Sequence, residues 1–292
     1  MSTAVDFNEE AVTFDCRGEP LVGVVARPHG DGSTVGAVIV VGGPQYRAGS
    51  HRQFVHWSRA LAAAGTPTLR FDVRGMGDSG GELRPFTALT DDIGAAIDAL
   101  RAACPQVERV VLCGLCDGAS AVLLYLNERP DARVAGLVLL NPWARSEQTQ
   151  ARTLVKHYYL QRLASRAFWA KLLRGQVALN AVRDLADHLR DARGARAPAV
   201  QRYQDRMRAG LEALSGPVLL ALCGEDYTAK EFLEHVASDA AWRAVLRRPQ
   251  VQRLDLPGAD HTLSSAAHRR QFEATSVVWF AAIDHSVTPV AA

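Results

Sequence analysis

The sequence predicts an α/β fold, built from a mostly parallel sheet with helices on both faces and interrupted by one helical insertion. Two observations lead to this fold class. Short runs rich in β-branched residues alternate with stretches of helical periodicity along most of the chain, which is typical of strands joined by crossover helices. The runs are also apolar throughout, as in residues 37–41, and this indicates strands that are buried on both faces.

The predicted elements follow one another in a simple order. A hairpin over residues 11–28 comes first, because apolar and polar residues alternate there around the turn Gly18-Glu19-Pro20. Later strands are predicted over residues 37–41, 68–71, 110–113, 134–140, 218–222 and 251–256. Helices are predicted between these strands: one that starts at the cap Ser50, one over residues 90–103, one that follows Gly114 and runs through Leu126, one that starts at the capping box Thr228-Ala229-Lys230-Glu231, and one over residues 272–282.

One long segment lacks the alternation. Residues 143–216 contain no convincing strand and are rich in arginine and helix-forming residues. We therefore predict an α/β core over residues 1–142 and 217–292, with residues 143–216 inserted as a helical cap.

Composition limits the classes of partner and location. The 33 Lys+Arg and 31 Asp+Glu give a formal charge of +2, which argues against nucleic acid because such binding needs uncompensated basic charge. No apolar run approaches the ~18 residues of a membrane span, and the first residues lack the features of a signal peptide. Five cysteines, an odd number, argue against a disulfide framework. We expect a soluble cytoplasmic protein with a small-molecule substrate and no cofactor or metal ion.

The most informative segment is Gly114-Leu115-Cys116-Asp117-Gly118, where a buried strand passes into a helix. The segment has the G-x-nucleophile-x-G pattern of a sharp turn that lifts the central side chain above the sheet. The position at a helix amino terminus favours a thiolate at Cys116, whereas the carboxylate of Asp117 disfavours it. The sequence therefore predicts a cysteine nucleophile that needs a basic partner.

Other interpretations of this segment remain open. A free cysteine is more commonly a small buried core residue. Cys113 and Cys116 also form a C-x-x-C pair, which is typical of redox sites, although Cys113 is expected inside the strand. Ser120 is a rival nucleophile, but it falls inside the helix.

The partners of Cys116 are predicted from residues that follow the last two strands. Asp226 comes just after residues 218–222, and His261 follows residues 251–256 and a Pro-Gly turn. Because the carboxyl ends of parallel strands meet at one edge of a sheet, these side chains are expected near Cys116. His261 is then the base and Asp226 the group that orients it, with Glu225 as the alternative acid.

The loop after residues 37–41 is expected to complete the site. The backbone N–H groups of Gly43 and Asp117 are the predicted oxyanion donors, with Gln45 as an alternative to Gly43, since Pro44 has no N–H. Two arginines near this loop are predicted to hold an anionic group, with a solvated role at the helix start as the alternative: Arg47 and Arg52. Four aromatic residues are predicted as walls of the pocket, with ordinary packing between cap and core as the alternative: Trp143, Tyr158, Tyr159 and Trp169.

Taken together, these motifs resemble the α/β-hydrolase superfamily, which implies the α/β-hydrolase fold. The cysteine at the turn is similar to that of dienelactone hydrolase. More narrowly, the chain resembles the exosortase A system-associated hydrolase 1 family in five segments: Gly42-Gly43-Pro44-Gln45-Tyr46-Arg47, Gly49-Ser50-His51-Arg52-Gln53-Phe54, Gly114-Leu115-Cys116-Asp117, Leu140-Asn141-Pro142-Trp143 and Lys156-His157-Tyr158-Tyr159-Leu160. This second resemblance implies a bacterial setting with exopolysaccharide production and PEP-CTERM protein sorting, but it supplies no substrate.

The resulting hypothesis is an acyl hydrolase or acyltransferase. Cys116, His261 and Asp226 would act on an ester, thioester or lactone, either free or linked to a carrier or CoA, through an acyl-cysteine intermediate. Two alternatives remain: a small-ester hydrolase without a link to polysaccharide, and a catalytically silent binding or scaffold protein on the same fold.

Overall fold

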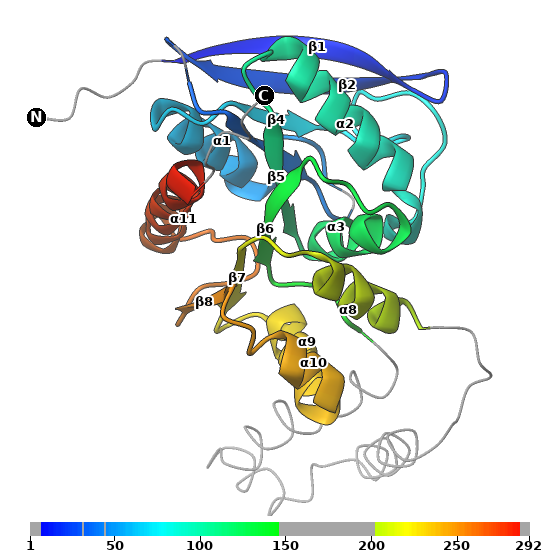
Figure 1. Cartoon of the computed structure of the whole chain (residues 1–292), viewed down its shortest axis with the longest axis vertical. Coiled ribbons are helices and arrows are strands. Elements are labelled where there is room, and N and C mark those ends of the chain that lie inside the picture. The colour runs from blue at the N-terminus through cyan, green and yellow to red at the C-terminus, as the bar shows by residue number, and fades with distance from the viewer. Residues whose placement is uncertain (1–6, 31, 44, 146–201, 287–292) are drawn as a thin grey trace, which may run out of the picture.

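The computed structural model of the chain describes residues 7–30, 32–43, 45–145 and 202–286. They form an eight-stranded sheet in the order β1-β2-β4-β3-β5-β6-β7-β8, with the first hairpin at one edge and β8 at the other (Figure 1). The pairs β1–β2 and β2–β4 are antiparallel, and the remaining pairs are parallel. The strands are β1 (Phe7–Cys16), β2 (Glu19–Pro28), β3 (Val35–Val40), β4 (Thr68–Phe71), β5 (Arg109–Leu115), β6 (Val134–Leu140), β7 (Val218–Cys223) and β8 (Val251–Leu256).

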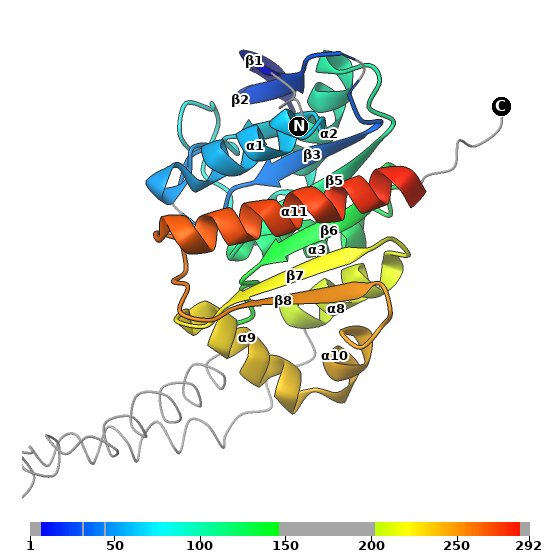
Figure 2. The same cartoon turned by 90° about the vertical axis from the view of Figure 1, so that its left-hand side faces the viewer.

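Helices cover both faces of this sheet. Figure 2 shows α1 and α11 in front of the strands, with α3 and α8 behind them. The described helices are η1 (Ser50–Arg52), α1 (Gln53–Ala63), η2 (Phe86–Ala88), α2 (Thr90–Ala103), α3 (Asp117–Glu128), α8 (Tyr203–Ala213), α9 (Tyr227–Ser238), α10 (Ala240–Val245) and α11 (Ala266–Ser286). The α/β-hydrolase fold predicted from the sequence is confirmed in this arrangement.

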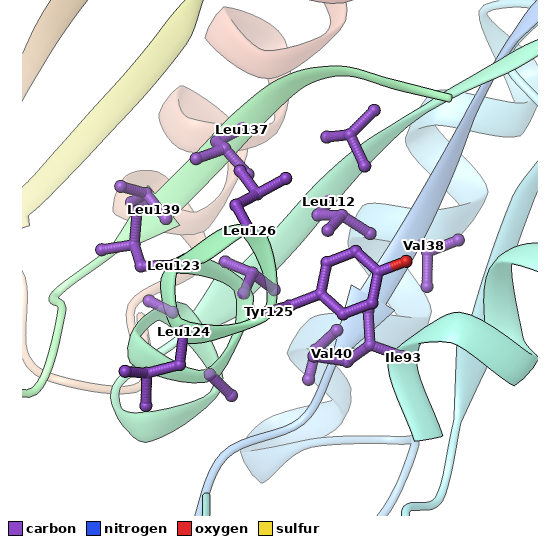
Figure 3. Packing of buried hydrophobic residues seen from close by; sticks show 14 of the residues in the cluster. Val38, Val40, Ile93, Leu112, Leu123, Leu124, Tyr125, Leu126, Leu137 and Leu139 are labelled. Carbon is purple, nitrogen blue, oxygen red and sulfur yellow. The ribbon is translucent and has the colours of Figure 1, made fainter. Parts of the chain in front are cut away.

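The two helical layers create two hydrophobic cores because neighbouring strand residues point to opposite faces. Val38 and Val40 of β3 face α2 and α3, whereas Ile39 packs with α1 and α11. Figure 3 shows the first core, where Tyr125 of α3 lies among aliphatic side chains from the strands and from Ile93 of α2. Strands buried on both faces need side chains that are apolar at every position, and this is why their sequences do not alternate.

The helix starts differ from the sequence prediction. Ser50 does not cap α1: it begins a short 3-10 turn, and the cap position is Arg52 in a left-handed conformation with φ 57°. The predicted capping box at Thr228 and Glu231 is not the cap of α9 either. Asp226 takes that position, and its side chain accepts the Thr228 N–H, while Glu231 is buried in an ion pair with Arg145 (2.9 Å).

Part of the predicted insertion packs with the core. Helix α8 lies against α3 and buries Met207 and Leu211 in the same hydrophobic core. Residues 146–201 lie outside the described residues, so the extent of the cap stays a prediction. None of the described helices is both long and apolar enough to cross a membrane.

Candidate active site

The turn between β5 and α3 has the strained geometry that its sequence predicts. Cys116 adopts φ 59° and ψ −125°, a region that non-glycine residues rarely occupy. A Cβ atom on Gly114 would lie 2.5 Å from the Ala119 nitrogen, and one on Gly118 would lie 2.5 Å from the Val40 oxygen. Only glycine fits at these two positions, which lets the neighbouring backbone pack close enough to hold the turn.

The end of β6 fixes the backbone of this turn. The Cys116 N–H donates to the Leu140 carbonyl (2.9 Å), and the Trp143 N–H donates to the Cys116 carbonyl (3.1 Å). Ser120 is fully buried, and its hydroxyl donates to the Trp143 carbonyl (2.7 Å). Ser120 thus supports the turn from beneath, while Cys116, which is half-buried, lies above the sheet.

His261 and Asp226 meet across the loops that follow β8 and β7. The His261 Nδ1 and the Asp226 Oδ2 are 2.8 Å apart. The other carboxylate oxygen of Asp226 accepts the Thr228 N–H (2.9 Å), so the residue that caps α9 also orients the histidine. Glu225, the alternative acid, is 69% exposed and lies 4.0 Å from Lys230 instead.

Electrostatics favour a charged His261 ring. Burial lowers the pKa of His261, but hydrogen bonds to Asp226 and Cys116 and the charges of both partners outweigh it and raise this pKa from 6.5 to about 10. Both groups act on this one ring, so Asp226, His261 and Cys116 lie in one site. The structure thus brings together the three residues predicted to form the triad.

The predicted oxyanion donors lie side by side. Gly43 follows β3 with φ +62°, and Asp117 is the first residue of α3. The alternative donor is already used, because the Gln45 N–H donates to the Gly43 carbonyl (2.8 Å). Burial raises the pKa of the Asp117 carboxyl, although backbone N–H groups, first among them that of Gly43, act against the rise. The Gly43 N–H therefore lies beside the Asp117 carboxylate, which competes for the donor with a substrate oxyanion.

The structure places Arg47 in ion pairs within the protein, and its anion-binding role stays a prediction. Its guanidinium pairs with Asp72, which is fully buried, and with Asp78 (2.6 Å). The Arg47 N–H also donates to Asp72 (2.6 Å). These contacts join the loop after β3 to the loop after β4, so Arg47 and Asp72 stabilise the loop that carries Gly43. No local pattern in the sequence revealed that Asp72 is the partner of Arg47.

The other predicted binding residues have different surroundings. Arg52 is exposed at the start of α1. Trp143 is half-buried beside the nucleophile turn, with the Arg145 guanidinium 4.2 Å from the centre of its ring. Tyr158 and Tyr159 lie outside the described residues, as does Trp169. A binding role for any of these residues stays a prediction.

Sequence reasoning missed Asn141 as a site residue. Asn141 directly follows β6, is fully buried, and has φ 47°. Its side-chain oxygen accepts the Cys223 N–H (2.8 Å), and its amide nitrogen lies 3.5 Å from the His261 carbonyl. The residue thus links the loops that carry the acid and the histidine. Asparagine tolerates a left-handed backbone better than most residues, and the Asn-Pro pair after a strand was the one available signal.

The fold and this geometry define an α/β-hydrolase. Residues 32–239 match the family described as serine aminopeptidase S33, and the chain belongs to this family. The family description names serine, whereas this chain has Cys116 at the turn. No curated protein matches the sequence.

Solved structures with the same fold include several esterases. An esterase of Rhizomucor miehei is 19% identical, with a TM-score of 0.63 over 97% of this chain and 86% of that chain. An esterase of Pyrococcus furiosus is 17% identical, with a TM-score of 0.62 over 94% and 91%. Est1E of Butyrivibrio proteoclasticus, solved with ferulic acid bound, is 18% identical, with a TM-score of 0.60 over 95% and 100%. At these identities the similarity shows the fold alone.

Proposed function

We propose that the protein is an acyl hydrolase that attacks an ester, thioester or lactone carbonyl with the sulfur of Cys116. The observation that carries the proposal is the position of His261, whose Nδ1 lies 2.8 Å from Asp226 and whose pKa is raised by Asp226 and Cys116 together. A nucleophile, a base and a group that orients the base in this relation are what covalent acyl transfer requires. Several solved structures of the same fold are esterases, which agrees with a carbonyl substrate.

In this proposal Cys116 passes its proton to His261 as the sulfur becomes the nucleophile. The pKa of His261 is raised to about 10, so the ring can hold this proton at neutral pH. The sulfur and the protonated ring then form the pair that acts on the carbonyl.

The reaction then proceeds in two steps. The Cys116 thiolate attacks the carbonyl carbon, and the backbone N–H groups of Gly43 and Asp117 stabilise the oxyanion. His261 donates its Nε2 proton to the leaving group as the bond to that group breaks, which leaves an acyl-cysteine and a neutral ring. The ring next takes a proton from water as water attacks the thioester, and collapse of the second oxyanion releases the carboxylic acid and restores the pair. An alcohol or amine in place of water makes the protein an acyltransferase.

The proposal includes a cellular setting. The resemblance to the exosortase A system-associated hydrolase 1 family suggests work on acyl groups in exopolysaccharide production, with the acyl group free or linked to a carrier or CoA. Deleting the gene and measuring exopolysaccharide acylation tests this link. Unchanged acylation would refute the link and leave the chemistry intact.

Alkylation by iodoacetamide at pH 7 tests the role of Cys116. Cys116 is half-buried, whereas Cys16, Cys104, Cys113 and Cys223 are buried. We expect rapid, selective alkylation of Cys116 that abolishes hydrolysis of an activated thioester. The Cys116→Ala variant should lose this activity, while the matched variant Cys16→Ala should keep it. Labelling of Cys116 as slow as that of Cys16 would favour a silent binding protein, and activity retained in Cys116→Ala would move the nucleophile to Ser120.

A further inference from the structure

A pocket of about 500 Å³ begins at the two oxyanion donors. Gly43 and Asp117 form one end of it, and the remaining wall comes from the loop after β4 and from the segment around η2. Val73 and Leu89 form its buried apolar part. This volume lies within the range of small-molecule sites, ~300–1,000 Å³. We call this cavity the oxyanion-side pocket.

The order of strands fixes which part of a substrate faces this pocket. Cys116 follows β5, with β3 and β4 on one side of it and β6, β7 and β8 on the other. Most residues that line the pocket come from the loops after β3 and β4, and Asp117 starts α3, whereas His261 and Asp226 follow β8 and β7. The leaving group must lie near His261 to receive its proton. A carbonyl bound at Gly43 and Asp117 therefore turns its leaving group toward His261 and its acyl substituent toward the oxyanion-side pocket.

The chemistry of the wall indicates the kind of acyl group. Met76 and Phe86 are half-buried in the wall, and Leu83 is 66% exposed. Asp117 and Arg84 are the charged residues in the lining, and the other lining residues are apolar or glycine. When an alkyl chain enters, water is released from an apolar wall of this kind, and this makes binding of the chain favourable. The flexible methionine side chain adapts its shape to such chains.

We propose that the oxyanion-side pocket binds an unbranched apolar acyl group longer than acetyl, so that the substrates are medium-chain acyl esters or thioesters. This assignment rests on the function proposed above. It separates the two halves of the substrate: the acyl chain lies over β3 and β4, and the leaving group lies over β6 to β8. Met76 is then a specificity-determining residue, because it lines the pocket without belonging to the triad or to the oxyanion donors.

Two substrate series test the proposal. The first keeps the leaving group as p-nitrophenol and lengthens the acyl group from acetyl through butyryl and hexanoyl to octanoyl. The second keeps the acetyl group and lengthens the alkyl thiol of a thioester. We expect kcat/KM to rise by up to about fourfold per buried methylene in the first series and to change little in the second.

Substitution of Met76 shows whether the chain lies in this pocket. Met76→Trp should fill the pocket and reduce kcat/KM for the octanoyl ester by about a hundredfold, because three to four methylenes of the chain would no longer be buried. The kcat/KM for the acetyl ester should stay within about twofold of the wild-type value. Met76→Ala should move the optimum to longer chains. Val278→Trp is the matched control, because Val278 is exposed on α11 on the other face of the sheet, and it should leave both series unchanged.

The possible failures are distinguishable. If acetyl and octanoyl esters react equally, or if the chain-length preference appears in the thiol series, the pocket assignment is overturned while the proposed hydrolase stands. If Met76→Trp affects all chain lengths equally, the chain binds elsewhere and the assignment also falls. If no ester or thioester of any length reacts and Cys116 is never acylated, the proposed function fails and the pocket assignment fails with it.

Discussion

Replacing Asp226 by asparagine tests the electrostatic core of the site while the helix cap is kept. Asp226 makes two contacts: one oxygen accepts the Thr228 N–H at the start of α9, and the other lies 2.8 Å from His261. Asparagine caps helices about as well as aspartate, so Asp226→Asn keeps the cap. Its NH2 group replaces the oxygen beside His261 and cannot accept from the ring, so the negative charge and this hydrogen bond are lost. Asp226→Ala loses both contacts.

The size of each effect follows from these contacts. Loss of an adjacent charge moves a pKa by about 1–3 units, so the pKa of His261 should fall in Asp226→Asn from about 10 to between about 7 and 9. Loss of an orienting carboxylate lowers kcat by up to about 10⁴-fold in a triad of this type, and we expect about 10²-fold to 10⁴-fold here. Asp226→Ala should also lose about 1 kcal/mol of cap stabilisation, which lowers Tm by about 2–4 °C in a chain of this size.

Nuclear magnetic resonance titration of ¹⁵N-labelled imidazole, initial rates with an activated ester and thermal unfolding measure the three effects. Glu225→Gln is the matched control, since Glu225 is exposed and lies against Lys230 rather than His261. It should change neither the titration nor the rate. An unchanged His261 titration in Asp226→Asn, or an equal loss of rate in Glu225→Gln, would refute the reasoning.

Three further predictions concern the same site. Asp117→Asn removes a negative charge beside Cys116, so alkylation of that cysteine at pH 7 should become up to about tenfold faster, as measured by mass spectrometry; slower alkylation would contradict this. Asn141→Ala leaves the buried Cys223 N–H without its acceptor, so chemical denaturation should show a loss of about 1–3 kcal/mol, and a wild-type unfolding midpoint would contradict it. Because the folded pKa of His261 exceeds its unfolded value of 6.5, the stability that wild type gains over His261→Ala should be fully present below pH 6.5 and decline as the pH rises toward about 10; a difference that grows with pH would oppose this.

Most of the fold could be predicted from the sequence because hydrophobic periodicity is a local property that each segment shows by itself. The strands 68–71, 134–140 and 251–256 have the predicted bounds. Residues 134–140 are an apolar run, which defines a buried strand without knowledge of its neighbours, whereas residues 251–256 form a mostly exposed strand at the sheet edge. Cys116, His261 and Asp226 were found because each follows a strand of a parallel sheet, and such positions converge at one edge.

The roles that sequence reasoning missed have a different physical cause: each depends on a contact with a residue that is distant in the sequence. Arg47 has the charge of an anion ligand, but Asp72, 25 residues later, already neutralises it. The Thr228 capping box matches the local pattern, yet Asp226 is the cap because its other oxygen is held by His261. Asn141 carries no local signal for linking two loops that begin far along the chain. Such roles become visible only when the elements are packed together.

Mass spectrometry of the protein mixed briefly with an activated ester tests the central claim most directly. The account predicts that one acyl group is added, that peptide mapping places it on Cys116, and that it is absent from Cys116→Ala. It also predicts that the adduct persists longer in His261→Ala, where no imidazole remains to activate water. An acyl group found on Ser120, or turnover of the ester with Cys116 never acylated, would contradict the account.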